Sequence, residues 1–157
     1  MVTRFITSIE IQASQETVFK VLCDLENYPY WHPSIKSIHG NMEKGNWLIA
    51  YFGKGKRSVK IPLELSVLEK NSILEWQGSL FKQGKTRKLF LVRHAFYIEV
   101  LNTGVIKFIN EEEFSPLLSL LVKRMEEKFI TGYQQVNQAL KNYCEALESD
   151  QSNKELA

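Results

Sequence analysis

The chain has 157 residues, of which 44% are hydrophobic and 24% charged, and its formal net charge at pH 7 is +2. Domains typically contain about 100–200 residues, so this length indicates one domain with a substantial core. The small net charge gives nucleic acid little electrostatic reason to bind, and no run reaches the roughly 20 apolar residues that a membrane span requires. We therefore expect a cytoplasmic protein with no nucleic-acid partner and no integral membrane segment.

The first element should be a strand followed by a short helix. RFITSIEI, residues 4–11, alternates, with one face made of Phe5, Thr7, Ile9 and Ile11. Ser14 is a suitable N-cap for a helix that runs to about Leu25. The next segment, YPYWHP (28–33), contains two prolines that disfavour helix in the residues before them, so we expect a rigid connection that fixes Trp31.

From Ile35 to Phe114 the pattern keeps alternating and is broken by short turn signals such as GN at 40–41 and NTG at 102–104. Six strands fit between these breaks. Because no helical segment separates them, they should form a curved antiparallel meander with one face covered.

The cover should be one long terminal helix that begins near Ser115. Its apolar residues recur every three or four positions: Leu118, Leu121, Met125, Phe129, Tyr133, Val136, Leu140, Tyr143 and Leu147. Gly132 interrupts this stripe at a cost of about 1 kcal/mol relative to alanine, which suggests that something approaches closely there. Residues 149–157 are polar and lack periodicity, so we expect a single α+β domain over 1–148 and a disordered tail.

Several apparent motifs do not support cofactor chemistry. GSLFKQGKT (78–86) resembles a phosphate-binding loop, but five residues rather than four separate its glycines and it joins two antiparallel strands. The three histidines, His32, His39 and His94, lack metal-ligand spacing, and Cys23 and Cys144 lie far apart in helical segments. We expect neither a metal nor a cofactor.

Three blocks of the chain resemble the START-like helix-grip superfamily, in particular its polyketide cyclase/dehydrase and lipid-transport (SRPBCC) group. The first block carries Ala13, Val18, Phe19, Leu22, Asp24, Tyr28, Trp31 and Pro33. The second carries His94, Phe96, Gly104, Phe108, Glu112, Phe114, Leu117 and Leu118. The third is GYQQVNQALK at 132–141.

The resemblance implies a helix-grip fold: a curved antiparallel sheet of about seven strands, two short helices after the first strand, and a long C-terminal helix across the sheet. Two positions depart from the family pattern. His32 stands where asparagine is common, and Pro116 replaces a glycine. Members of the group include carriers, receptors and cyclases, so the fold alone does not fix the activity.

An apolar cavity between the sheet and the long helix is the expected site, because small-molecule sites have hydrophobic walls with a few polar groups. His94, Asn110 and Glu112 interrupt otherwise apolar strand faces. They form either a closed hydrogen-bond network or a polar hook for a ligand hydroxyl or carbonyl. The candidate ligand-binding residues are Trp31, Trp47, Trp76, His94, Phe96, Phe108, Asn110, Glu112, Phe129 and Tyr133.

These features favour a protein that binds a hydrophobic small molecule, a lipid or a polyketide-like compound, without catalysis. The first alternative is a cyclase or dehydratase that uses His94 and Glu112 as its acid–base pair. The second is a protein-partner module that uses the exposed face of the sheet or the basic hairpin tips. These tips contain Lys54, Lys56, Arg57, Lys82, Lys85, Arg87 and Lys88, which could equally be solvated turn residues. The oligomeric state does not follow from the sequence.

Overall fold

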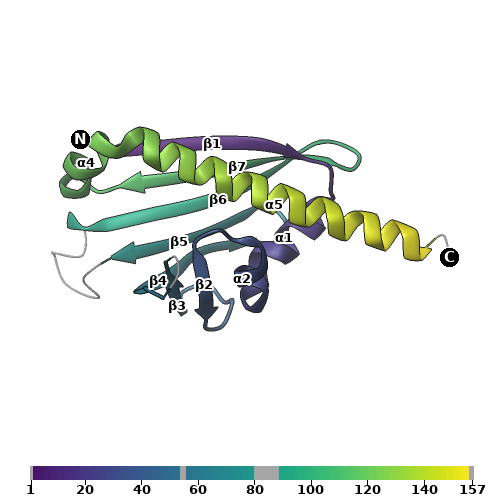
Figure 1. Cartoon of the computed structure of the whole chain (residues 1–157), viewed down its shortest axis with the longest axis horizontal. Helices are drawn as coiled ribbons and strands as arrows, with labels where there is room; N and C mark the ends of the chain where they lie inside the picture. Colours follow the sequence, from purple (N-terminus) through teal and green to yellow (C-terminus); the bar gives the residue numbers. More distant parts are fainter. Residues whose placement is uncertain (1, 54–55, 80–88, 156–157) are drawn as a thin grey trace.

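The computed structural model describes residues 2–53, 56–79 and 89–155 and shows one sheet with helices on one face (Figure 1). The N-terminal half contains β1 (Thr3–Ile11), α1 (Gln15–Cys23), the 3-10 turn η1 (Leu25–Asn27), α2 (Tyr28–Trp31), β2 (Ile35–His39), β3 (Trp47–Phe52), β4 (Val59–Glu69) and β5 (Ile73–Ser79). The C-terminal half contains β6 (Leu91–Asn102), β7 (Val105–Phe114), α4 (Pro116–Val122), the 3-10 turn η2 (Lys123–Met125) and α5 (Glu126–Glu155). The expected α+β class is correct.

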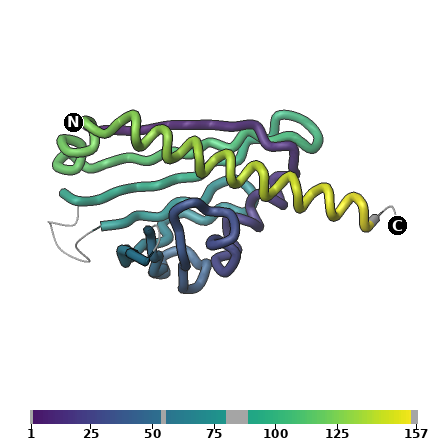
Figure 2. The backbone as a smooth tube through the Cα atoms, in the orientation of Figure 1, coloured from purple at the N-terminus to yellow at the C-terminus, as the bar shows by residue number. Residues whose placement is uncertain are grey.

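All seven strands form one antiparallel sheet in the order β1-β7-β6-β5-β4-β3-β2. Strands β2 to β7 follow one another as the predicted meander, whereas β1 lies at the far edge beside β7 (Figure 2). This pairing places Phe5 opposite Glu112 and Thr7 opposite Asn110. The sheet therefore brings the start of the chain to the polar positions of β7.

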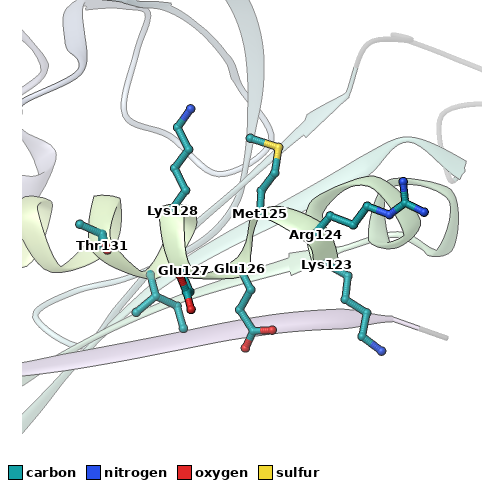
Figure 3. Close-up of a pocket in the computed structure, with 8 residues that line it drawn as sticks. Lys123, Arg124, Met125, Glu126, Glu127, Lys128 and Thr131 are labelled. Carbon is teal, nitrogen blue, oxygen red and sulfur yellow. The ribbon is translucent and has the colours of Figure 1, made fainter.

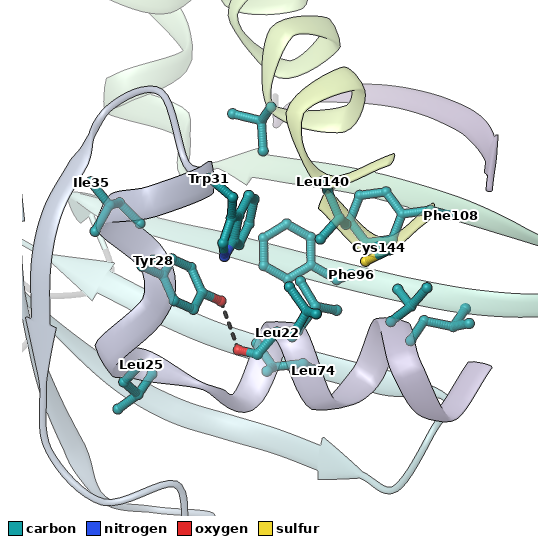
Figure 4. Close-up of a cluster of buried hydrophobic side chains, with 14 of the residues drawn as sticks. Leu22, Leu25, Tyr28, Trp31, Ile35, Leu74, Phe96, Phe108, Leu140 and Cys144 are labelled. Atoms are coloured by element: carbon teal, nitrogen blue, oxygen red, sulfur yellow. Dashed lines mark hydrogen bonds between the residues drawn. The ribbon is translucent and has the colours of Figure 1, made fainter. Parts of the chain in front are cut away.

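The inner face of the sheet forms the core with α1, α2 and α5. The larger cluster includes Ile11, Leu22, Tyr28, Leu48, Leu65, Leu74, Phe96, Phe108 and Leu140, all almost fully buried (Figure 4). A smaller cluster of Phe5, Phe114, Val122 and Tyr133 fills the end beneath α4. The strand residues among them follow the period of two expected for a sheet with one covered face.

The outer face carries a ladder of charged side chains across β1, β7, β6 and β5. Arg4 contacts Glu113 at 2.6 Å, and Arg93 contacts Glu75 at 2.7 Å and also Glu111. Opposite charges on neighbouring strands support the sheet modestly when they are exposed. On this face, the charged groups named here are engaged with one another.

The corner after α1 is helical, and the expectation of a non-helical connection there was wrong. Tyr28 adopts helical angles (φ −51°, ψ −42°) immediately before Pro29, a combination that proline normally disfavours. Complete burial of Tyr28 and a 2.8 Å hydrogen bond from its hydroxyl to the Leu22 carbonyl offset that cost. The corner ends at His32, whose Nδ1 accepts hydrogen bonds from the backbone N–H groups of Ser34 and Ile35 at 3.1 and 3.0 Å.

The terminal helix is interrupted, although the apolar stripe predicted one continuous element. The α4 helix packs at the end of the sheet, where the Ser119 hydroxyl accepts a hydrogen bond from the Thr3 N–H at 2.8 Å. The η2 turn then redirects the chain so that α5 crosses the inner face (Figure 1). The change of direction leaves Leu121, a member of the predicted stripe, 67% exposed beside Leu120.

Two further expectations about α5 were wrong. Residues 149–155 continue the helix rather than forming a disordered tail, and the Ser149 and Ser152 hydroxyls donate to carbonyls one turn earlier. A Cβ built on Gly132 would meet no atom within 4 Å, so no close approach explains this glycine. No helix among the described residues is long and apolar enough to cross a membrane.

Candidate functional site

A chain of four polar side chains, three of them buried and His94 partly exposed, crosses the interior and links β6, β7, α5 and β1. His94 Nε2 lies 2.7 Å from Asn110 Oδ1, Asn110 Nδ2 donates to Asn137 Oδ1 at 3.0 Å, and Asn137 Nδ2 donates to Thr7 Oγ1 at 2.9 Å. Each buried amide thus has partners for both its oxygen and its nitrogen, as buried polar groups require. This relay fixes the position of the His94 ring.

The relay also determines which His94 nitrogen carries the proton. In the orientation of the two amides, Asn110 Oδ1 can only accept, so His94 Nε2 must donate. Neutral His94 therefore has its lone pair on Nδ1, which lies 3.7 Å from Glu112 Oε1. A protonated Glu112 can direct its O–H toward that lone pair.

Burial keeps both members of this pair uncharged at neutral pH. It raises the pKa of Glu112 from 4.5 to about 8. It lowers the pKa of His94 from 6.5 to about 4, against the opposing effect of the Asn110 hydrogen bond. Since Glu112 holds its proton more tightly than His94, the contact at pH 7 joins a carboxylic acid and a neutral imidazole rather than two ions.

Aromatic rings surround the pair. The ring centroids of His94 lie 4.5 Å from Phe96 and 6.0 Å from both Trp76 and Tyr133. Phe108 stacks on Phe96, Phe129 contacts Tyr133, and Trp31 joins the set through Tyr28. Nine of the ten residues predicted to bind a ligand thus form one connected set, the exception being Trp47.

Trp47 lies away from the others. On β3 its neighbours Leu48 and Ala50 are buried, so the side chain of Trp47 points from the outer face and is 40% exposed. Successive strand residues point to opposite faces, so Trp47 cannot share the face of Leu48 and Ala50, but the run WLIA at 47–50 is apolar throughout and did not show which of its residues face inward.

Two polar atoms of the interior lack partners. The Tyr133 hydroxyl and the Trp31 indole N–H are both buried, and neither has a hydrogen-bond partner within the described part of the chain. The Trp31 side chain points into the buried cluster (Figure 4). Because an unpaired buried polar group costs about 1–3 kcal/mol, such groups mark positions where another molecule can supply the missing bond.

His94 and Glu112 are partly exposed, although the residues around them are buried. The His94 and Glu112 side chains remain 17% and 14% exposed, whereas Phe96, Asn110 and Phe114 around them are at most 4% exposed. At least a water-sized opening must therefore adjoin the imidazole and the carboxyl group.

Sequence reasoning missed two residues of the site, Tyr28 and Asn137. Asn137 lies four residues after Tyr133 and three before Leu140, so its helical spacing placed a polar group on the buried stripe. Tyr28 gave no such signal. Its burial depends on the helix at 28–31, and Pro29 made a helix at that position seem unfavourable.

A surface depression lies elsewhere, at the junction of η2 and α5 (Figure 3). Its volume is about 910 Å³, and its lining residues are Lys123, Arg124, Met125, Glu126, Glu127, Lys128, Ile130 and Thr131. None of the predicted site residues is among them, and charges of both signs spread around it (Figure 3). A second groove of about 400 Å³ lies between α1 and α5.

Other sequence expectations fall partly outside the structure. The segment that resembles a phosphate-binding loop begins at Gly78, near the end of β5. Its part from residue 80 onward lies outside the described residues. The same holds for most of the basic hairpin tips, of which only Lys56 and Arg57 are described. Cys23 and Cys144 are free thiols. Over residues 2–53, 56–79 and 89–155, no three ligating side chains gather in a metal-binding cluster.

A sheet of seven antiparallel strands wrapped against a long helix over an aromatic interior defines a helix-grip domain. Residues 2–145 match the model of the family described as polyketide cyclase / dehydrase and lipid transport, and the chain belongs to that family. A comparison with curated proteins gives no match.

Solved structures of known proteins share this fold. A START superfamily protein from Mycobacterium smegmatis is 19% identical, with a TM-score of 0.69 over 92% of this chain and 98% of its own. The ZhuI aromatase/cyclase from Streptomyces sp. R1128 is 11% identical, with a TM-score of 0.67 over 92% and 94%. A norcoclaurine synthase from Thalictrum flavum is 14% identical, with a TM-score of 0.64 over 92% and 94%. At such identities the likeness concerns the fold alone.

Proposed function

We propose that this domain binds an apolar small molecule, a lipid or a polyketide-like compound, in the interior between the sheet and α5, without converting it. The observation that carries this proposal is the partial exposure of His94 and Glu112 inside a set of buried aromatic rings. Apolar walls with a few polar groups at one place are the usual design of a small-molecule site. The family description, which includes lipid transport, supports the same reading.

The first experiment is native mass spectrometry of freshly purified protein, with extraction of whatever is released on denaturation. We expect a stoichiometric adduct of apolar character. A clean apo mass, together with no rise in melting temperature across lipid and polyketide panels, would contradict the proposal.

Matched tryptophan variants locate the binding. Trp76→Phe changes an inner-face ring beside His94, whereas Trp47→Phe changes an exposed ring on the outer face. We expect Trp76→Phe to weaken ligand binding several-fold and Trp47→Phe to leave the dissociation constant within about twofold, since only the first ring can touch the ligand. Equal effects of the two variants would place binding outside the interior.

A second candidate function is an enzyme of the cyclase or dehydratase type. It is favoured by the neutral Glu112 acid beside His94, because an acid that holds its proton at pH 7 can protonate a developing oxyanion or a leaving hydroxyl. Turnover of a polyketide-like substrate that is unchanged in the His94→Ala, Glu112→Ala double variant would exclude it.

A further inference from the structure

We propose that the polar end of the interior, formed by His94, Glu112 and Tyr133, selects an uncharged ligand with a carbonyl or hydroxyl oxygen and rejects ligands that carry a carboxylate. This inference rests on the proposed binding function. It specifies the chemical class of the ligand.

The first reason is the set of available hydrogen-bond donors. The Tyr133 hydroxyl is buried and has no partner in the described part of the chain, and its ring lies 6.0 Å from that of His94. Glu112, whose raised pKa of about 8 keeps its proton at neutral pH, adds a second donor when its O–H turns from His94 Nδ1, 3.7 Å away, toward the ligand. A ligand oxygen with two lone pairs can accept from both groups.

The second reason is that the described part of the interior holds no cation to neutralise an acid. Among the described residues, the buried set contains no lysine or arginine. Arg93, the residue before His94, points to the outer face, where it contacts Glu75 and Glu111. A carboxylate bound inside would lie in a medium of low polarity without a counter-charge, which is strongly unfavourable.

The third reason is that His94 cannot serve as the counter-charge for a ligand carboxylate. Its Nε2 is committed to Asn110 by the buried relay, and its Nδ1 faces Glu112. Protonating His94 to pair with a ligand carboxylate would require proton uptake at a site where burial lowers its pKa to about 4. His32, the nearest further imidazole, uses its Nδ1 to accept two backbone N–H groups.

The test uses three ten-carbon probes that differ only at the polar end: decan-1-ol, decan-2-one and decanoate. Isothermal titration at pH 7 with the whole chain should give dissociation constants for the alcohol and the ketone at least tenfold lower than for decanoate. Decanoate binding as tightly as the ketone would overturn the selectivity while leaving the proposed function intact. Binding of none of the three, with an empty adduct spectrum, would overturn both.

The variant Tyr133→Phe separates a ligand contact from a structural role. Because the hydroxyl has no partner in the described part of the chain, its removal should leave the melting temperature of the apo protein unchanged or slightly higher. Affinity for decan-2-one should nevertheless fall about fivefold or more. Unchanged ketone affinity in this variant would overturn the assignment of Tyr133. Glu113→Gln, on the outer face of the same strand as Glu112, is the matched control and should bind all three probes as the wild type does.

Discussion

Folding shifts the pKa of Glu112 and the pKa of His94 in opposite directions from their values in an unfolded chain. Burial raises the pKa of the carboxyl group to about 8 and lowers that of the imidazole to about 4. The folded state therefore keeps the Glu112 proton after the unfolded chain has lost it, so stability falls as pH rises from about 4.5 to 8. For His94 the sign is reversed, and stability falls as pH drops from about 6.5 to 4.

The variant Glu112→Gln should remove the alkaline part of this dependence. Between pH 6.5 and 8 the free energy of unfolding of the wild type should fall relative to that of the variant by up to about 1.4 kcal/mol per pH unit, because Glu112 keeps its proton only in the folded state. Glutamine cannot ionise, so the variant should keep only the gain in stability toward neutral pH that the buried histidines contribute. Urea titrations at four pH values measure this, with Glu113→Gln as the control that keeps the slope. Parallel slopes for wild type and Glu112→Gln would show that Glu112 titrates normally.

The hydrogen bonds of His32 explain how a histidine can replace the asparagine that is common at this position in the family. Its Nδ1 occupies the position where the side-chain oxygen of asparagine would accept the same N–H groups of Ser34 and Ile35. Burial, together with the charge that His94 gains below about pH 4, lowers the pKa of His32 to about 3. The side chain is thus a neutral acceptor that closes the corner.

We expect His32→Asn to keep the stability at pH 7 within about 0.5 kcal/mol and His32→Ala to lose about 1–2 kcal/mol, because only alanine leaves the two N–H groups unpaired. Thermal and urea unfolding of the two variants provide the comparison. If His32→Asn were as unstable as His32→Ala, the ring rather than the hydrogen bonds would hold the corner.

At the scale of elements, the strands followed from the sequence and the helix break did not. In a strand with one covered face, apolar and polar residues alternate. This alternation identified RFITSIEI and the segments up to Phe114 as strands. Leu121 and Met125 keep helical spacing across the break, and nothing local shows that α4 must turn at the end of the sheet. The pairing of β1 with β7 likewise depends on contacts between distant residues and cannot be read from either segment.

The same reasoning predicted most of the site but not its connections. His94, Asn110 and Glu112 were visible as polar residues on apolar faces. Their order in the relay, and the partnership with Asn137 and Thr7, required the register of three strands and the rotation of α5. Sequence periodicity gives a residue's face and says little about its neighbours across that face.

In α5, Gly132 offers a simple gain in stability. Its position is helical and a Cβ there would meet no atom within 4 Å, so alanine fits without strain. We expect Gly132→Ala to raise the free energy of unfolding by about 0.5–1 kcal/mol, because glycine loses more backbone entropy in a helix. Chemical denaturation tests this. A decrease would mean that a bound molecule or a motion of α5 requires the absence of a Cβ at this position.

At the scale of the whole molecule, side chains of α5 hydrogen-bond to the start of α1 and hold it in place. Glu148 on α5 accepts hydrogen bonds from the Ser14 N–H at 3.2 Å and the Thr17 hydroxyl at 2.5 Å, and Lys141 Nζ donates to the Glu10 carbonyl at 2.7 Å. The start of α1 and the end of β1 are therefore held by residues near the end of the chain.

Truncations should show a sharp boundary within α5. A chain ending at Ser149 keeps Cys144 and Glu148, and the described side chains that it loses, at 150–154, are exposed, so its stability should fall by less than about 1 kcal/mol. A chain ending at Tyr143 loses the buried Cys144, the partly buried Leu147, and the carboxylates of Glu145 and Glu148, which accept hydrogen bonds from Gln12 before α1 and from the start of α1. It should be destabilised by more than about 3 kcal/mol. Circular dichroism melts of both chains measure this. Similar melting temperatures would mean that the final turns do not hold α1.

The edge position of β1 has a consequence for biosynthesis. During synthesis β1 and α1 leave the ribosome before the other described elements, yet the only strand that pairs with β1 among the described residues is β7, and the carboxylate that binds the start of α1 belongs to Glu148. The backbone of β1 and the start of α1 therefore lack these partners until β7 and α5 have been translated. Contacts so distant in sequence favour slow folding, and they leave the apolar face of β1 available to chaperones throughout elongation.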